Sequence, residues 1–152
     1  MKTLSHAADK AELLRRLQAV SPDSPAKWGR MSAHQMICHV TDSFRGPLKE
    51  KAMSVAPGWH FRPLMKWFAL SAPFPWPKNL GTLPEMDQQQ GGTPPADFLA
   101  DVTNLKAAVE RFSTRSRDYA WPPHPIFVTL SLDEWMRWGY LHMDHHLRQF
   151  GA

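Results

Sequence analysis

The sequence predicts an all-α fold: a four-helix bundle with one long connection between its second and third helices. Four segments of the 152-residue chain carry apolar residues at helical spacing, near residues 5–20, 32–47, 94–114 and 131–150. Two of these segments open with a capping box, in which a serine is followed three residues later by Gln or Glu. A chain of this length fits one domain, so we expect residues 1–152 to form a single helical domain.

A serine marks the expected start of each of the first two segments. Ser5 is the expected N-cap of the first, whose apolar positions are Leu13, Leu14, Leu17 and Val20. The second opens at a capping box formed by Ser32 and Gln35, and Pro47 should kink or end it.

The third and fourth segments are longer. The third follows Thr93-Pro94-Pro95 and runs through Phe98, Val102, Leu105, Val109 and Phe112. The fourth opens at Ser131, which forms the second capping box with Glu134, and it ends at Phe150-Gly151.

The long connection, about residues 52–92, is rich in proline and aromatic residues, with a short helix expected near 63–70. A connection of this length in a small domain is usually functional or disordered, and its aromatic content argues against disorder. We therefore expect it to pack as a cover over one end of the bundle, using Trp59, Phe61, Trp67, Phe74 and Trp76.

Charge and composition exclude several classes of protein. The net charge is +4, but the basic residues are spread along the chain instead of concentrated on one face, so we expect no nucleic-acid partner. No stretch approaches the roughly 20 apolar residues that span a bilayer, so no membrane partner is expected. The single cysteine, Cys38, and the charged N-terminal segment without a signal-peptide pattern favour a cytoplasmic protein.

The histidines of the last segment are spaced for metal binding. His142 and His146 are one helical turn apart and fall within or beside the apolar arc of their helix, whereas His145 projects about 100° from His146. Two imidazoles at i and i+4 can converge on one ion, as in helical zinc sites.

A third ligand must come from another helix. His39 flanks the inward stripe of the second segment, while His34 points to the opposite side and Cys38 is expected to be a packed or surface thiol. Metal sites inside helix bundles are assembled in this way from facing helices. The spacing alone leaves the alternative open that these are hydrogen-bonded core histidines without a metal.

Three parts of the chain resemble the DinB-like superfamily of metal-binding four-helix bundles. The tail His142-x-x-His145-His146-x-x-Gln149 is similar to the end of its last helix. The segment from Trp28 through Met31, Gln35, Met36, His39 and Val40 is similar to its early histidine-bearing helix. The run from His124-Pro125 through Trp135 to Phe150, which includes this tail, resembles one uncharacterised branch especially closely.

The resemblance implies a function for these residues. It implies that His39, His142 and His146 bind a divalent ion, zinc or nickel, with His145 and Gln149 in a supporting shell around them. It also implies activation of a low-molecular-weight thiol, or hydrolysis of a small substrate. Metal-bound water or thiol would be the nucleophile, and no catalytic side chain is assigned.

The small-molecule substrate is expected to meet basic side chains near the cover, and the candidates are Arg45, Arg62 and Lys66. A homodimer is one possible assembly. The alternative function is a non-catalytic metal- or ligand-binding bundle with a structural ion. Three evident ligands favour catalysis, because a closed structural site usually has four; His145, His60 or His124 could supply a fourth.

Overall fold

The structure, a computed structural model, describes residues 1–55, 62–127 and 129–152, with the backbone alone at Arg62 and Pro63. The described residues are all-helical and contain no strand, which confirms the predicted fold class. Their elements are α1 (Ala7–Leu17), α2 (Ala33–Arg45), α3 (Arg62–Ser71), the short 3-10 helix η2 (Pro84–Met86), α4 (Phe98–Ser113) and α5 (Leu132–Gln149).

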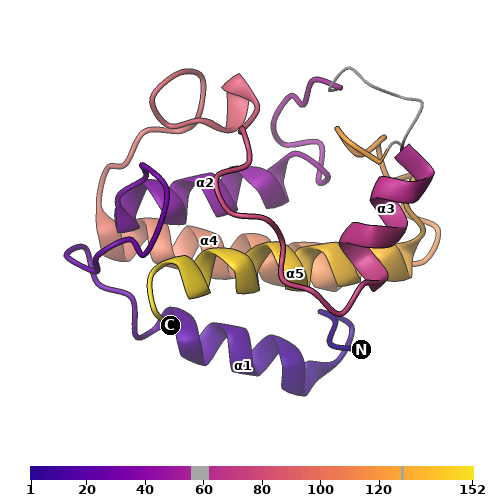
Figure 1. Ribbon diagram of the computed structural model, residues 1–152, viewed down its shortest axis with the longest axis horizontal. Coiled ribbons are helices and arrows are strands. Elements are labelled where there is room, and N and C mark those ends of the chain that lie inside the picture. The colour runs from indigo at the N-terminus through magenta and orange to yellow at the C-terminus, as the bar shows by residue number, and fades with distance from the viewer. Residues whose placement is uncertain (56–61, 128) are drawn as a thin grey trace.

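Five α-helices are therefore present in the described part of the chain, so the predicted count of four is not confirmed. The additional helix is α3, which covers the short helix expected near residues 63–70. It packs against α5, as does α1, while α2 packs against both α4 and α5. Figure 1 shows the connection after α3 passing across α5 to reach η2 beside α2. None of the helices described is long and apolar enough to cross a membrane.

Local side-chain bonds explain where the helices begin. Both predicted capping boxes are present, formed by Ser32 with Gln35 and by Ser131 with Glu134, and they start α2 and α5. The prediction that Ser5 caps α1 is wrong. A turn closed by the His6 N–H on the Thr3 carbonyl precedes the helix, and His6 stands at the N-cap position.

The remaining differences at the helix ends also have local causes. Helix α4 begins at Phe98, later than expected, because the side chain of Asp97 accepts the backbone N–H of Ala100 and caps it there. Helix α1 ends at Leu17, three residues before the predicted end, and Val20 is buried just beyond it.

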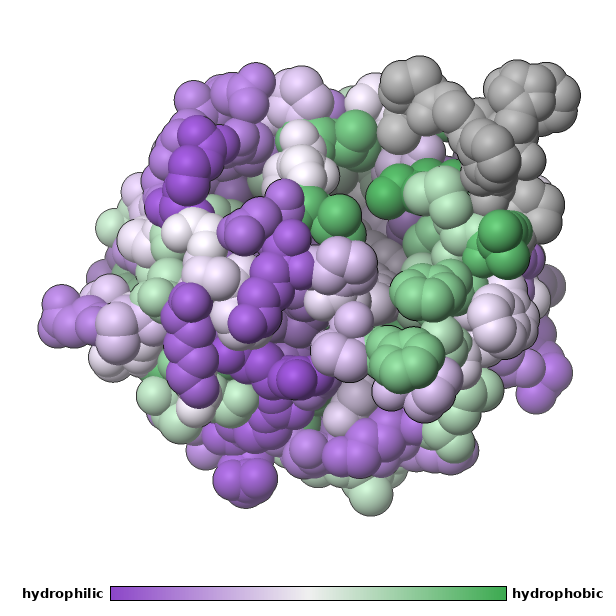
Figure 2. Space-filling model, in the orientation of Figure 1, coloured by the Kyte–Doolittle hydropathy of each residue, from purple (hydrophilic) through white to green (hydrophobic). Residues whose placement is uncertain are grey.

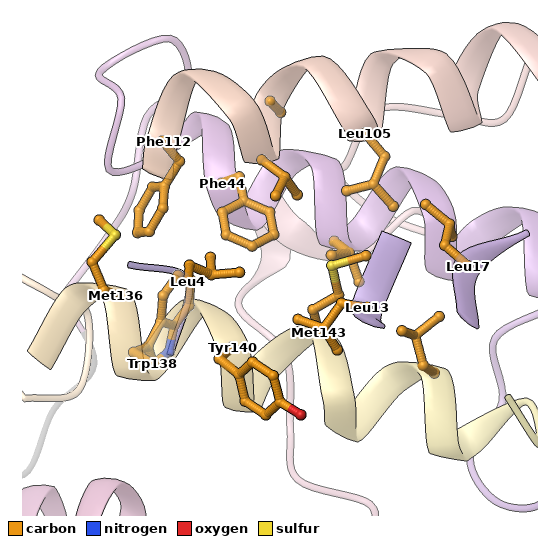
Figure 3. Packing of buried hydrophobic residues seen from close by; sticks show 14 of the residues in the cluster. Leu4, Leu13, Leu17, Phe44, Leu105, Phe112, Met136, Trp138, Tyr140 and Met143 are labelled. Atoms are coloured by element: carbon orange, nitrogen blue, oxygen red, sulfur yellow. The ribbon is translucent and has the colours of Figure 1, made fainter. Parts of the chain in front are cut away.

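The hydrophobic core lies between α1, α2, α4 and α5, as Figure 3 shows. Phe44 and Phe112 meet edge to face, with ring centroids 5.0 Å apart. Gly139 allows α5 to approach this pair closely, because a Cβ atom there would lie 2.7 Å from Leu4 and 3.1 Å from each ring. This packing fixes the rotation of α5, and therefore the direction in which its histidines point.

Candidate metal centre

Three histidines from two helices converge inside the bundle. His39 lies on α2, and His142 and His146 lie one turn apart on α5. Each offers a ring nitrogen within 4.8 Å of those of the other two. The ring centroids of His39 and His142 are 5.4 Å apart, and that of His146 is 4.8 Å from each. The three residues that the sequence selected therefore form one compact cluster.

The imidazole of His39 is oriented by a backbone carbonyl. Its Nδ1 lies 2.8 Å from the carbonyl oxygen of Met86, the last residue of η2. A carbonyl can only accept, so Nδ1 carries the proton and donates. The lone pair is then on Nε2, which is free to bind a cation.

The imidazole of His146 is held in the same tautomer by Gln149. Nδ1 of His146 lies 2.9 Å from Oε1 of Gln149, whose Nε2 donates to the carbonyl oxygen of Trp28 at 2.7 Å. Gly29 makes this second bond possible, because its φ of +82° turns the chain and a Cβ atom there would lie 2.6 Å from Gln149 Nε2. His146 therefore also presents Nε2 with its lone pair.

The third imidazole has an unsatisfied atom. Nε2 of His142 is buried and has no hydrogen-bond partner among the described residues. Buried polar atoms are nearly always paired in proteins, so an unpaired nitrogen beside two other imidazoles requires an explanation. A cation bound by all three rings would satisfy this atom.

The electrostatic environment keeps all three rings neutral. Burial lowers the pKa of His39, although the Met86 carbonyl and the carboxylate of Asp42 oppose the shift. Burial, reinforced by the neighbouring imidazoles, lowers the pKa of His142 and of His146 well below its usual value. Neutral imidazoles keep the lone pairs that a metal requires, so the cluster is suited to a cation at neutral pH.

Residues 2–152 match the model of the family described as "Protein of unknown function (DUF1569)". The chain belongs to this family. No match was found among curated proteins or among solved structures. The family description specifies no chemistry, so only the residues of the cluster indicate a function.

The histidines that could have supplied a fourth ligand are placed elsewhere. The ring of His145 is 5.2 Å from that of His146 but packs against Trp28 and Trp76, outside the cluster. His124 accepts the backbone N–H groups of Ile126 and Phe127 on Nδ1, and burial lowers its pKa to about 3. That histidine therefore stabilises its loop as a neutral acceptor. His60 lies outside the described residues.

Of the three basic residues expected near the substrate, Arg45 and Lys66 have their described partners away from the cluster. Arg45 is near the carboxylates of Asp42 and Glu50, and it lines a cavity that none of the three histidines lines. Lys66 forms an ion pair with Glu134 at 2.8 Å, at the start of α5. The side chain of Arg62 lies outside the described part of the chain.

The long connection covers the cluster only in part. Trp76 packs edge-on against His142, with ring centroids 6.0 Å apart, and Met86 supplies the carbonyl that orients His39. Other large apolar side chains of α3 and the following loop are exposed, namely Leu64, Met65, Trp67, Phe68 and Phe74. Figure 2 shows hydrophobic residues gathered on the side of the molecule where α3 lies in Figure 1. Trp59 and Phe61, also expected in the cover, lie outside the described residues.

Two features of the site region were missed in the sequence. Asp42 is fully buried and accepts hydrogen bonds from the backbone N–H and the hydroxyl of Thr93, each at 2.7 Å, which ties the loop after η2 to α2. A second cluster joins His34, Cys38 and Asp101. The i, i+4 spacing of His34 and Cys38 was the available signal, since it matches that of His142 and His146.

Proposed function

We propose that the chain is a divalent-metal-binding protein of the DinB-like superfamily, and that His39, His142 and His146 hold the ion through their Nε2 atoms. In this assignment α1, α2, α4 and α5 are the four helices of the bundle, and α3 belongs to the connection between the second and the third. Residues 1–152 then form one domain.

One observation carries the proposal: the unpaired, buried Nε2 of His142 lies between two imidazoles whose Nδ1 atoms are already bonded to protein oxygens. Metal-binding histidines characteristically donate their second ring nitrogen to a carbonyl or amide oxygen. Nε2 of His142 completes the set, because an ion placed among the three rings would also bind this atom.

The chemistry we propose is that of a metal-dependent enzyme acting on a small molecule, as a thiol transferase or a hydrolase. A zinc or nickel ion with an open position lowers the pKa of a coordinated thiol or water. The protein's own residues orient the ligands: Met86 and Gln149 fix two imidazoles, and Trp138, with its ring centroid 5.0 Å from that of His142, supplies an apolar wall.

A structural ion is the second candidate, and the burial of two ligands favours it. His39 and His146 are only 5% and 7% exposed, so access for a substrate depends on the partly exposed His142. In that case a fourth protein ligand would close the coordination sphere.

The experiment that tests the proposed function begins with metal content. The full-length protein is stripped with a chelator, reloaded with zinc or nickel, dialysed and measured by elemental analysis. Loaded and stripped samples, and His142→Ala treated in the same way, are then compared for thiol addition to an electrophile and for hydrolysis of an activated ester. Retained metal with faster turnover supports the enzyme. Retained metal with equal rates supports the structural ion, and no retained metal overturns both.

A further inference from the structure

A second group of ligating side chains lies on another flank of α2. His34 and Cys38 are one turn apart on this helix, and Asp101 faces them from the first turn of α4. The ligating atoms of the three lie within 4.8 Å of one another. Cys38 and His39 are consecutive residues but belong to different groups, so α2 carries one cluster on each of two faces.

The distances fit a tetrahedral ion with small adjustments. Sγ of Cys38 lies 3.6 Å from Oδ2 of Asp101, and the corresponding edge of a zinc tetrahedron is about 3.5 Å from typical Zn–S and Zn–O distances. Nε2 of His34 lies 2.8 Å from the same oxygen, about 0.5 Å shorter than the tetrahedral N–O edge. A rotation of one side chain supplies that difference.

Hydrogen bonds hold the cluster together when no ion is bound. Oδ2 of Asp101 accepts from Nε2 of His34, from the thiol of Cys38 and from the backbone N–H of Ala96. These three bonds hold the carboxylate of Asp101 in one orientation beside the other two donors. The group is therefore a preorganised anionic site with a nitrogen and a sulfur donor beside it.

A cavity gives this group access to solvent. It has a volume of about 310 Å³ and is lined by Cys38, Asp101 and Asn104 together with the charged side chains of Arg45, Glu50 and Arg111. An ion needs a route of approach and, with three protein ligands, a place for an exchangeable fourth ligand. The cavity offers both on the side of the thiol and the carboxylate.

We propose that His34, Cys38 and Asp101 form a second divalent-metal site, separate from the three-histidine cluster and selective for ions that accept sulfur, such as zinc and cobalt. Binding transfers the thiol proton of Cys38 to solvent and moves the imidazole proton of His34 from Nε2 to Nδ1. The mixed nitrogen, oxygen and sulfur ligands suit zinc better than magnesium or calcium, which prefer oxygen alone. Because Cys38 is the single cysteine of the chain, any metal–thiolate signal must come from this site.

Cobalt(II) is the probe that separates the two sites. The full-length, reduced protein is titrated with cobalt under anaerobic conditions, and the charge-transfer absorption of cobalt–thiolate bonds is followed in the near ultraviolet. We expect about two ions per chain and one thiolate band. Cys38→Ser should abolish the band and lower the stoichiometry to about one, while His142→Ala should keep the band and lose the other ion.

Two variants on α4 test whether Asp101 binds the ion. Asp101→Asn should weaken the cobalt affinity of the thiolate site at least tenfold, and Thr103→Ala, on the same helix, should leave it unchanged. If Asp101→Asn fails to fold, as judged by circular dichroism, the Cys38→Ser and His142→Ala comparison still decides. Absence of a thiolate band in the wild-type protein overturns this inference alone. A band that persists while His142→Ala changes nothing overturns the three-histidine site instead.

Discussion

Oε1 of Gln149 lies 2.9 Å from Nδ1 of His146, and the same side chain reaches back to the carbonyl of Trp28. One glutamine thus links the end of α5 to the segment that precedes α2, and it fixes the ring of a proposed metal ligand. The chain before α2 contributes to the site in this way without containing any ligand itself.

Replacing Gln149 should therefore weaken metal binding without removing a ligand. Gln149→Ala leaves the imidazole of His146 free to rotate, and the loss of such a supporting partner typically costs 10–100-fold in affinity. Competition with a chromogenic chelator measures the change. Gln18→Ala, an exposed glutamine just after α1, should bind like the wild type. Equal affinities of Gln149→Ala and the wild type would show that the hydrogen bond does not orient the ligand.

Asp42 should influence the site from a distance, through the loop that carries Met86. Asp42→Asn removes a buried charge that accepts two hydrogen bonds from Thr93. A hydrogen bond to a charged group contributes about 1.5–3 kcal/mol to the stability of the folded state. We expect the free energy of unfolding in urea to fall by about that amount, and metal affinity to fall with it. Asp23→Asn, at an exposed position, is the matched control. If Asp42→Asn is as stable as the wild type but binds metal more weakly, Asp42 does not support stability and metal binding together by anchoring this loop.

Acid should destabilise the metal-free protein through His124. Its pKa is about 3 in the folded state, below the ordinary value of 6.5, so between these limits the unfolded chain binds the extra proton. The contribution of neutral His124 to the free energy of unfolding is complete above pH 6.5. It falls as the pH decreases, by up to about 1.4 kcal/mol per pH unit.

Urea unfolding between pH 6 and 5, where most carboxylates remain ionised, measures this slope. His124→Asn keeps an acceptor for the loop N–H groups but cannot be protonated, so its slope should be shallower by about 1 kcal/mol per pH unit. The cluster histidines, whose pKa values are also lowered, contribute equally to both proteins. Identical slopes would mean that His124 can be protonated without breaking its loop.

The parts of the fold that could be predicted are those encoded locally. Ser32 and Ser131 begin their helices because each bonds a residue three positions away, and such a signal is complete within four residues. The convergence of His142 and His146 follows from helix geometry in the same way. The prolines at 94 and 95 predict an earlier start for α4, but the side chain of Asp97 caps the helix and begins it at Phe98.

What the sequence could not show depends on contacts between distant segments. Met86 holds His39 through a backbone carbonyl, an atom that every residue possesses, so nothing in the sequence marks it. Asp101 joins His34 from 67 residues away, and only the packing of α2 on α4 brings the two together. A short helix was expected where α3 lies, but its packing on α5 was not.

The central claim, one ion held by His39, His142 and His146, is tested most directly by metal retention in a Cys38→Ser background, which removes the second proposed site. We predict that His39→Ala, His142→Ala and His146→Ala each lose zinc on dialysis and also lose the zinc-dependent rise in melting temperature. His145→Ala, a neighbouring histidine outside the cluster, should retain about one ion per chain. Equal zinc content in all four variants and their Cys38→Ser parent, or a loss confined to His145→Ala, would contradict the account.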